Sequence, residues 1–391
     1  MKKGTIEKKK KKVARIFKIC TWLIAFTMEM FLATGCSSDF GSDNGNINVH
    51  VDTNVNVNGE NVEGVKEGEM EEADPTEVTD TSSAEKIEII CTSYAAYDWI
   101  QNIIAGHSDR FEVRYLLDQG VDLHSYQPGV DDIAAINDCD LLVYVGGESD
   151  EWVGEIIGKD GKDASHTFSM MEALGDYVYE EETVEGMEPE AEDADDPQAG
   201  GEMSAEEAEG EETEFDEHVW LSVKNAARIV PALETELETL DAQDAADLKK
   251  SSDEYVEKLN ALDKEYEDAC DTAGRKIVLF GDRFPFRYLV EDYGIDYYAA
   301  FSGCSAEAEA SFTTVAFLAA KVNELDIPVV FTIENADTSV AEMIVDNTNK
   351  KSAKIITMDS LQSVNKDDIV GGKNYIDTMR SNLEVLKEAM N

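Results

Sequence analysis

Histidines are few in this chain, and two of the five occupy settings suited to metal binding. His124 lies in GVDLHSYQP, directly after the apolar run FEVRYLL, which predicts a β-strand. Ligands of α/β proteins bind beyond the carboxyl ends of strands. His218 lies in DEHVWL, where a strongly acidic stretch gives way to apolar residues. Because imidazole is the commonest metal-binding side chain, we expect His124 and His218 to bind one metal ion.

The remaining histidines and the cysteines show no such pattern. His50 lies in a polar segment, His107 follows a glycine at the end of a predicted helix, and His166 precedes TFSMM. The six cysteines are irregularly spaced and form no CxxC pair, which predicts buried single thiols rather than a disulfide framework. The sequence leaves open whether Cys304, in GCSAEAEAS, lies near a binding cleft.

The elements that must position these side chains alternate between strand and helix. KIEIICTS (86–93) predicts a buried strand, and residues 94–105 have helical spacing of their aromatic and apolar residues. The rhythm restarts with KIVLF, YYAAF, PVVFTI and KIITM, and NYIDTMRSNLEVLKEAM predicts a closing helix. Such alternation predicts an α/β fold with two lobes, each a parallel β-sheet flanked by helices, joined by one long connecting helix.

Composition divides the chain into segments of different character. Residues 36–85 are polar, residues 180–217 are dominated by Asp and Glu, and neither resembles a packed element. The expected organisation is a signal peptide (1–35), a disordered tether (36–85), an N-terminal α/β lobe (86–222) with an acidic disordered insertion (180–217), a long connecting helix region (223–273) and a C-terminal α/β lobe (274–391).

The N-terminus predicts export and lipid anchoring. A lysine cluster precedes a mostly apolar stretch, which ends on LATGCSS, and this sequence resembles a bacterial lipobox with Cys36 as the lipidated residue. The alternative is an uncleaved membrane anchor, but Glu29 within the apolar stretch would be costly in a bilayer. We therefore expect the chain to be lipid-anchored at the extracytoplasmic face of the cell membrane.

Charge and motifs exclude some classes of function. The formal net charge of −51 repels polyanions, so we expect no nucleic-acid partner. No HExxH motif is present, so a secreted zinc-dependent hydrolase has no support beyond the two histidines. The acidic insertion predicts either a surface that gathers cations or a solvated spacer.

GVDLHSYQP and DEHVWLSVKNA resemble the first two ligand motifs of the zinc and manganese solute-binding proteins of ABC importers, cluster A-I. The second motif usually reads Asp-Pro-His-Val-Trp-Leu-Asp-Pro-x-Asn-Ala, and this chain departs from it at Glu217 and Ser222. The resemblance runs from about residue 86 to the C-terminus, excluding the acidic insertion. It implies ligands from the second lobe as well. The matching positions are Asp282, for which Arg283 is the ungapped alternative, and Asp359, with Glu334 as runner-up.

The resemblance also implies a function. It predicts a monomeric, non-enzymatic binding protein that captures Zn²⁺, or alternatively Mn²⁺, between its lobes and delivers the ion to an ABC transporter membrane permease. A set of two imidazoles and two carboxylates suits either metal. A surface adhesin-type lipoprotein is the further alternative.

Overall fold

The computed structural model describes residues 86–160, 166–188, 214–305 and 309–391. The predicted signal peptide, Cys36 and the predicted tether therefore lie outside the described residues, as does the central part of the acidic insertion. In the described part, no helix combines the length and apolar character needed to cross a membrane.

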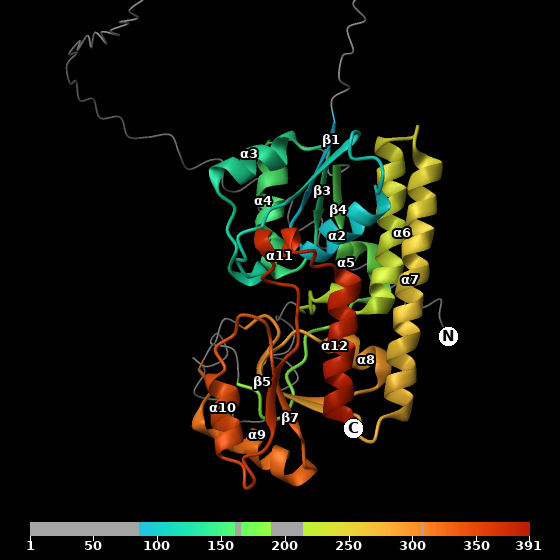
Figure 1. Cartoon of the computed structure of the whole chain (residues 1–391). Coiled ribbons are helices and arrows are strands. Elements are labelled where there is room, and N and C mark those ends of the chain that lie inside the picture. The colour runs from blue at the N-terminus through green and yellow to red at the C-terminus, as the bar shows by residue number, and fades with distance from the viewer. Residues whose placement is uncertain (1–85, 161–165, 189–213, 306–308) are drawn as a thin grey trace, which may run out of the picture. The chain divides into compact units, whose positions relative to one another are not determined.

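The first lobe is built on a four-stranded parallel sheet in the order β2-β1-β3-β4. The sheet lies between α3 and α4 on one side and α2, α6 and α7 on the other (Figure 1). Its chain runs through β1 (Ile87–Cys91), α2 (Tyr94–Ile103), β2 (Phe111–Tyr115), the 3₁₀ turn η1 (Leu123–Ser125), α3 (Val130–Asp138), β3 (Leu141–Tyr144), η2 (Glu148–Asp150), α4 (Glu151–Asp160), β4 (Thr167–Ser169), α5 (Met170–Leu174), η4 (Gly175–Tyr177) and η6 (Val219–Leu221).

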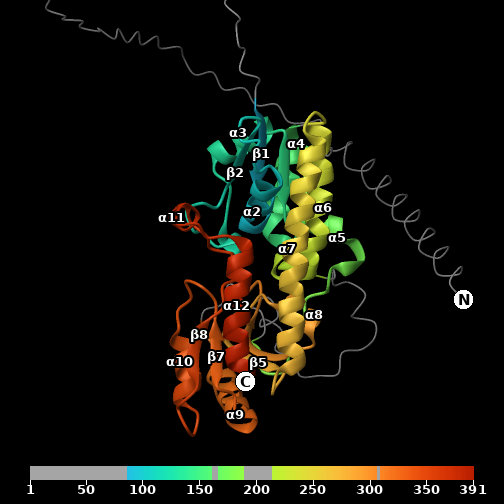
Figure 2. The same ribbon diagram turned by 45° about the vertical axis from the view of Figure 1, so that its right-hand side comes forward.

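Two helices, rather than one, occupy the predicted connecting region. They are α6 (Val223–Leu240) and α7 (Ala245–Thr272). The turn between them is held by first-lobe side chains, since Asp241 binds Arg110 and Asp244 binds His107. Helix α6 packs along α7, and α7 runs beside both lobes (Figure 2). At 1.5 Å per residue, the 28 residues of α7 span about 42 Å.

The second lobe repeats the parallel architecture with the strand order β6-β5-β7-β8. Its elements are β5 (Ile277–Phe284), α8 (Arg287–Tyr293), β6 (Asp296–Ser302), α9 (Phe312–Leu325), β7 (Val329–Thr332), α10 (Ser339–Asp346), β8 (Lys354–Thr357), α11 (Lys366–Val370) and α12 (Tyr375–Met390). The predicted fold of two parallel α/β lobes is thereby confirmed.

The end of the chain ties the lobes together. Lys366 N donates to Asp118 O at 2.7 Å, so α11 reaches back to the first lobe. Helix α12 then packs against α7, α2 and β5, and Tyr266 and Tyr375 are buried in this contact. The apolar core is continuous from the first lobe through α6, α7 and α12 into β5 and β7.

The ends of the predicted acidic insertion have defined positions. Glu180 pairs with Phe215 in an antiparallel bridge, and Glu188 N donates to Ala300 O at 2.9 Å in the second lobe. Met187 is buried. The segments 180–188 and 214–217 thus pack against the folded body, so the predicted disordered insertion is too long at both ends.

Candidate metal site

His124 is positioned by a short turn beyond the end of β2. Asp122 caps the 3₁₀ turn η1, and its Oδ1 accepts the His124 backbone N–H at 3.0 Å. Leu123 is buried beneath the turn. The His124 side chain is 9% exposed, so one edge of its ring faces solvent.

His218 is held more rigidly at the entrance to the long helices. It precedes η6, whose residues Val219 to Leu221 are buried, and Ser222 then caps α6. Asp216 Oδ1 accepts both the His218 backbone N–H at 2.9 Å and Nδ1 at 3.0 Å. The imidazole is fully buried. A single carboxylate therefore fixes both the backbone and the ring of this residue.

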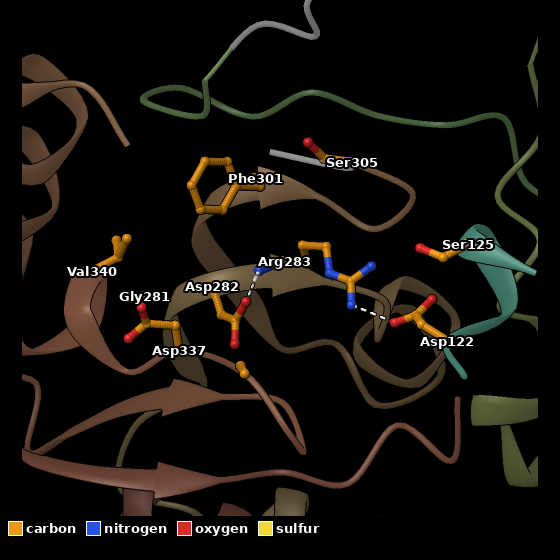
Figure 3. Close-up of a pocket in the computed structure, with 10 residues that line it drawn as sticks. Asp122, Ser125, Gly281, Asp282, Arg283, Phe301, Ser305, Asp337 and Val340 are labelled. Carbon is orange, nitrogen blue, oxygen red and sulfur yellow. Dashed lines mark hydrogen bonds and ion pairs between the residues drawn. The ribbon is translucent and has the colours of Figure 1, made fainter. Parts of the chain in front are cut away.

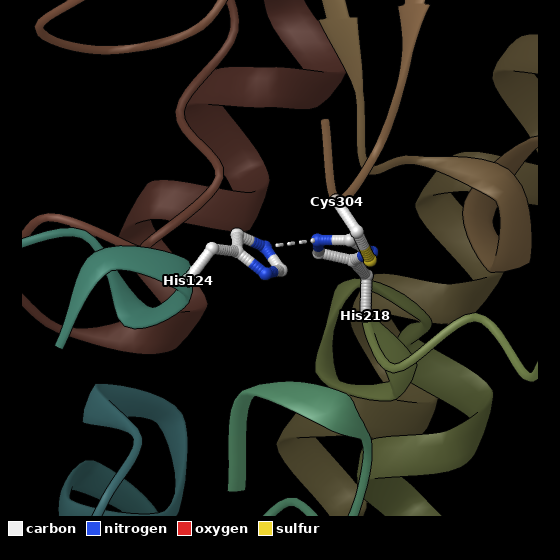
Figure 4. Close-up of side chains that lie close together, drawn as sticks. All are labelled: His124, His218 and Cys304. Carbon is white, nitrogen blue, oxygen red and sulfur yellow. Dashed lines mark hydrogen bonds between the residues drawn. The ribbon is translucent and has the colours of Figure 1, made fainter. Parts of the chain in front are cut away.

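The two imidazoles point their Nε2 atoms at each other across 3.0 Å (Figure 4). Each Nδ1 already faces a carboxylate, since His124 Nδ1 lies 3.1 Å from Glu217 Oε1 and His218 Nδ1 binds Asp216. A carboxylate can only accept, so each Nδ1 is the donor toward its carboxylate, and Nε2 is the ring atom left to face an ion. Two imidazole nitrogens that converge, with a carboxylate behind each ring, form the usual arrangement at histidine metal sites.

Glu217 is locked in place as an anion. Ser149 Oγ donates to its Oε1 at 2.6 Å, and Ser149 N donates to its Oε2 at 3.2 Å. Burial alone would raise the pKa of Glu217, but hydrogen bonding to His124 and Ser149 and the charge of the two imidazoles lower it to about 2. The site therefore holds a fixed negative charge at neutral pH.

Cys304 is the second lobe's contribution to this cluster. It follows β6, and one donor atom each from His124, His218 and Cys304 lie within 4.8 Å of one another. Its Sγ donates to Glu217 Oε1 at 3.5 Å. Gly303 permits the approach, since a Cβ there would lie 2.7 Å from His218 Cε1. Burial, with the nearby Glu217, raises the pKa of the Cys304 thiol well above its usual range.

The structure places Asp282 and Arg283 away from the imidazoles. The strand β5 continues past KIVLF to Phe284, with a register shift between Phe280 and Arg283. Successive side chains of a strand point to opposite faces, so Asp282 and Arg283 have different neighbours. Asp282 accepts the backbone N–H of Ile333 at 2.9 Å and of Arg283 at 2.8 Å. Its carboxylate thus lies on the second lobe's own strand end rather than beside the histidines, and its role as a ligand stays a prediction.

Arg283 instead reaches across to the first lobe. Its Nη2 lies 2.6 Å from Asp122 Oδ2, the residue that caps the turn carrying His124 (Figure 3). Both residues line a cavity of about 280 Å³, together with Asp282, Ser305 and Asp337. An ion pair between the lobes therefore occupies the region in which the sequence predicts a third ligand.

Asp359 and Glu334 lie in a separate group at the second lobe. Asp359 Oδ2 binds Lys373 Nζ at 2.6 Å, and Oδ1 accepts the Leu361 backbone N–H. Glu334 accepts from Ser360 N at 2.6 Å and from Ser360 Oγ at 2.7 Å. These carboxylates shape the loop after β8. The structure does not bring Asp359 to His124 and His218, and its role as a ligand also stays a prediction.

Sequence reasoning missed the groups that make the histidine pair a site. Asp216 and Glu217 stand two positions and one position before His218, so the tripeptide DEH was the available signal. Ser149 and Cys304 lie in loops without a recognisable pattern, and only the fold brings them to the histidines.

Comparison with known proteins finds similar chains over most of the described residues. The family model described as zinc-uptake complex component A, periplasmic (ZnuA), matches residues 89–389. The zinc-binding lipoprotein AdcA of Streptococcus pneumoniae serotype 4 is 32% identical over 305 residues, which cover 78% of this chain and 56% of AdcA. The chain therefore spans about half the length of that relative. The high-affinity zinc uptake system protein ZnuA of Bacillus subtilis is 28% identical over 309 residues, covering 79% of this chain and 89% of that protein.

Solved structures give the same result for the fold. The Zn(II)-bound ZnuA-like domain of Streptococcus pneumoniae AdcA superposes with a TM-score of 0.59 at 26% identity, covering 78% of this chain and 99% of that domain. The metal-dependent lipoprotein YcdH of Bacillus subtilis gives a TM-score of 0.60 at 24% identity and covers 78% of this chain and 99% of that one.

Proposed function

Because the chain belongs to the family of zinc-uptake complex component A, we propose that it captures Zn²⁺ with His124 and His218 and delivers the ion to the membrane permease of an ABC importer. The observation that carries the proposal is the convergence of the two Nε2 atoms at 3.0 Å, each backed by a carboxylate. The names of AdcA and of the Bacillus ZnuA, both zinc-binding or zinc-uptake proteins, support zinc as the cargo.

Electrostatics favours arrival of a cation at this site. His124 borders a cavity of about 580 Å³ that is also lined by the carboxylates of Glu148, Glu151 and Glu155. Acidic groups concentrated around an opening raise the local concentration of cations and speed their association. An entering ion therefore meets the partly exposed His124 ring first, and the buried His218 ring lies behind it.

The roles of the carboxylates beside the imidazoles support capture of an ion without bond-breaking. Glu217 and Asp216, the carboxylates nearest the imidazoles, both orient a ring nitrogen. An ion held between the lobes favours the closed arrangement, because only that arrangement assembles all of its ligands. We propose that the permease recognises the closed form and that the chain acts as a monomer, anchored through Cys36 at the extracytoplasmic face.

Titration of Zn²⁺ and Mn²⁺ into the purified full chain tests the proposal. We expect one tightly bound Zn²⁺ per chain, and loss of this binding in both His124→Ala and His218→Ala. His107→Ala is the matched control, since His107 binds Asp244 at the turn between α6 and α7. Metal binding that is indifferent to His124 and His218 would overturn the proposal.

The same titration decides the predicted second-lobe ligands. Asp282→Ala and Asp359→Ala are expected to bind Zn²⁺ more weakly if these carboxylates turn toward the ion on closure. If they keep the contacts to Ile333 and Lys373, both variants bind as the parent does. From those contacts we expect the second result.

A further inference from the structure

We propose that the Cys304 thiolate is the third protein ligand of the bound ion, and that it is the group by which the second lobe closes on the metal. This inference rests on the proposed function and names the donor that completes the site. His124 and His218 belong to the first lobe, whereas Cys304 follows β6 of the second. In Figure 4 the Cys304 sulfur lies at the His218 ring, while His124 points toward this ring from the left.

The distances fit coordination with small movements. The donor atoms of the three residues lie within 4.8 Å of one another. With zinc–nitrogen bonds of about 2.0 Å and zinc–sulfur bonds of about 2.3 Å, tetrahedral ligands stand roughly 3.3–3.6 Å apart. Shifts of about 1 Å therefore bring all three donors onto one ion. A water molecule would fill the fourth position.

The fold around Cys304 is built for this approach. Gly303 has its Cα against the His218 ring, and any Cβ there would collide with Cε1 and Nδ1 of that ring. The strand β6 can therefore end directly over His218, with the next side chain beside the imidazoles. Among the described residues, Cys304 is the second-lobe member of this donor cluster, because Arg283 binds Asp122 and Asp282 binds backbone N–H groups.

The proton that Cys304 loses on metal binding has an acceptor beside it. Binding replaces the S–H bond by a bond from sulfur to the metal, and the proton leaves through Glu217 Oε1, which already accepts from Sγ at 3.5 Å. A coordinated thiol is deprotonated outright by the ion. The proton then passes to solvent, and no oxidant or reductant is involved.

A thiolate ligand has a consequence for selectivity. Thiolate is a soft donor that favours zinc, whereas Mn²⁺ prefers carboxylate, carbonyl and water oxygens. A site with two imidazoles and one thiolate therefore discriminates against Mn²⁺ more strongly than two imidazoles and two carboxylates would. Cys304 thus sets the choice of cargo that the histidines alone leave open.

Cobalt provides a direct test, because a thiolate bound to Co²⁺ gives a charge-transfer band in the near ultraviolet that imidazole and carboxylate do not. We expect the purified full chain with Co²⁺ to show this band, and Cys304→Ser to lose it. In Cys304→Ser, Zn²⁺ affinity should fall by at least the roughly 10–100-fold that loss of an outer-shell partner costs, and the preference for Zn²⁺ over Mn²⁺ should narrow. Cys139→Ser is the matched control, since that buried thiol donates to Ile136 O.

The outcomes separate the two proposals. Co²⁺ that binds through the histidines without the band, or a band that persists in Cys304→Ser, overturns the role of Cys304 and leaves zinc capture standing. A parent chain that binds neither Co²⁺ nor Zn²⁺ overturns both. If Cys304→Ser does not fold, alkylation of the parent chain replaces it. Zn²⁺ should protect Cys304 from iodoacetamide, and unchanged alkylation would refute ligation.

Discussion

Two carboxylates of the first lobe and two of the second have opposite pKa shifts. On the first lobe, burial would raise the pKa of Glu217 and of Asp122, but imidazoles and Arg283 respectively reverse the shift and lower both. On the second lobe, burial raises the pKa of Asp282, and backbone N–H groups offset this only in part. Burial and the charge of Asp359 raise the pKa of Glu334.

Glu217 and Glu334 make the comparison sharpest, because a serine holds each of them in the same way. Ser149 donates to Glu217 through its backbone and its hydroxyl, and Ser360 does the same for Glu334. The neighbouring groups differ, since Glu217 faces imidazoles and Glu334 faces another carboxylate. The first lobe therefore presents a preorganised anionic support for ligands, whereas the second lobe's acids hold a loop.

Among the carboxylates and cations that support the ligands, the largest effect on Zn²⁺ binding is expected for Glu217→Gln. The amide keeps the size of the side chain but removes the charge that orients His124 and raises the basicity of its Nε2. We expect Zn²⁺ affinity to fall by about 10–100-fold, as for other partners of metal-binding histidines. Competition titration against a chromophoric chelator measures this change. An affinity equal to that of the parent chain would show that the carboxylate behind His124 has no part in metal binding.

A smaller effect on Zn²⁺ affinity is expected when Arg283, the second-lobe cation that binds first-lobe Asp122, is removed. Arg283→Ala removes the ion pair with Asp122, whose other oxygen holds the backbone of His124. We expect Zn²⁺ affinity to fall by about 1 kcal/mol, roughly fivefold, because the turn η1 loses one restraint. Arg114→Ala is the control, since its pair with Asp132 lies within the first lobe and is more exposed. Equal effects in both variants would remove any special role of the interlobe pair.

Much of this arrangement was predictable because its signals are local. Apolar runs of four to eight residues marked the buried parallel strands, and the expected strands 86–93 and 276–280 correspond to β1 and β5. The short β4 was missed, since a three-residue strand has no measurable period. The break between α6 and α7 was missed because tertiary contacts of Asp241 and Asp244 stabilise it.

Some residues of the site were likewise identifiable from local sequence, whereas others depend on the fold. His124 and His218 were identified from their positions at a strand end and at a boundary of acidic sequence. Asp282 was named from the family resemblance, as a residue that follows the predicted strand KIVLF. The strand instead continues to Phe284, and Asp282 accepts the backbone N–H of Ile333, directly after β7. Cys304 depends on the packing of Gly303 against a ring about 85 residues earlier in sequence, which no local pattern encodes.

The smallest effect on zinc is expected for Glu334→Gln, which should bind Zn²⁺ as the parent chain does. The two variants should differ in folding stability: relative to the parent, the stability of Glu334→Gln and that of Glu217→Gln should change with pH in opposite directions. A raised pKa means that the folded state holds its proton more tightly than the unfolded state, so the charge of Glu334 costs stability as pH rises above about 4.3. The stability of Glu334→Gln relative to the parent should therefore increase with pH.

Glu217, with its pKa at about 2, contributes stability that is present above about 4.3 and lost as pH falls toward 2. Glu217→Gln should therefore become less stable, relative to the parent, as pH rises over that range. Urea unfolding of both variants and the parent, without metal, between pH 3 and pH 7 measures the two slopes. Slopes of the same sign would contradict the contrast between the two lobes.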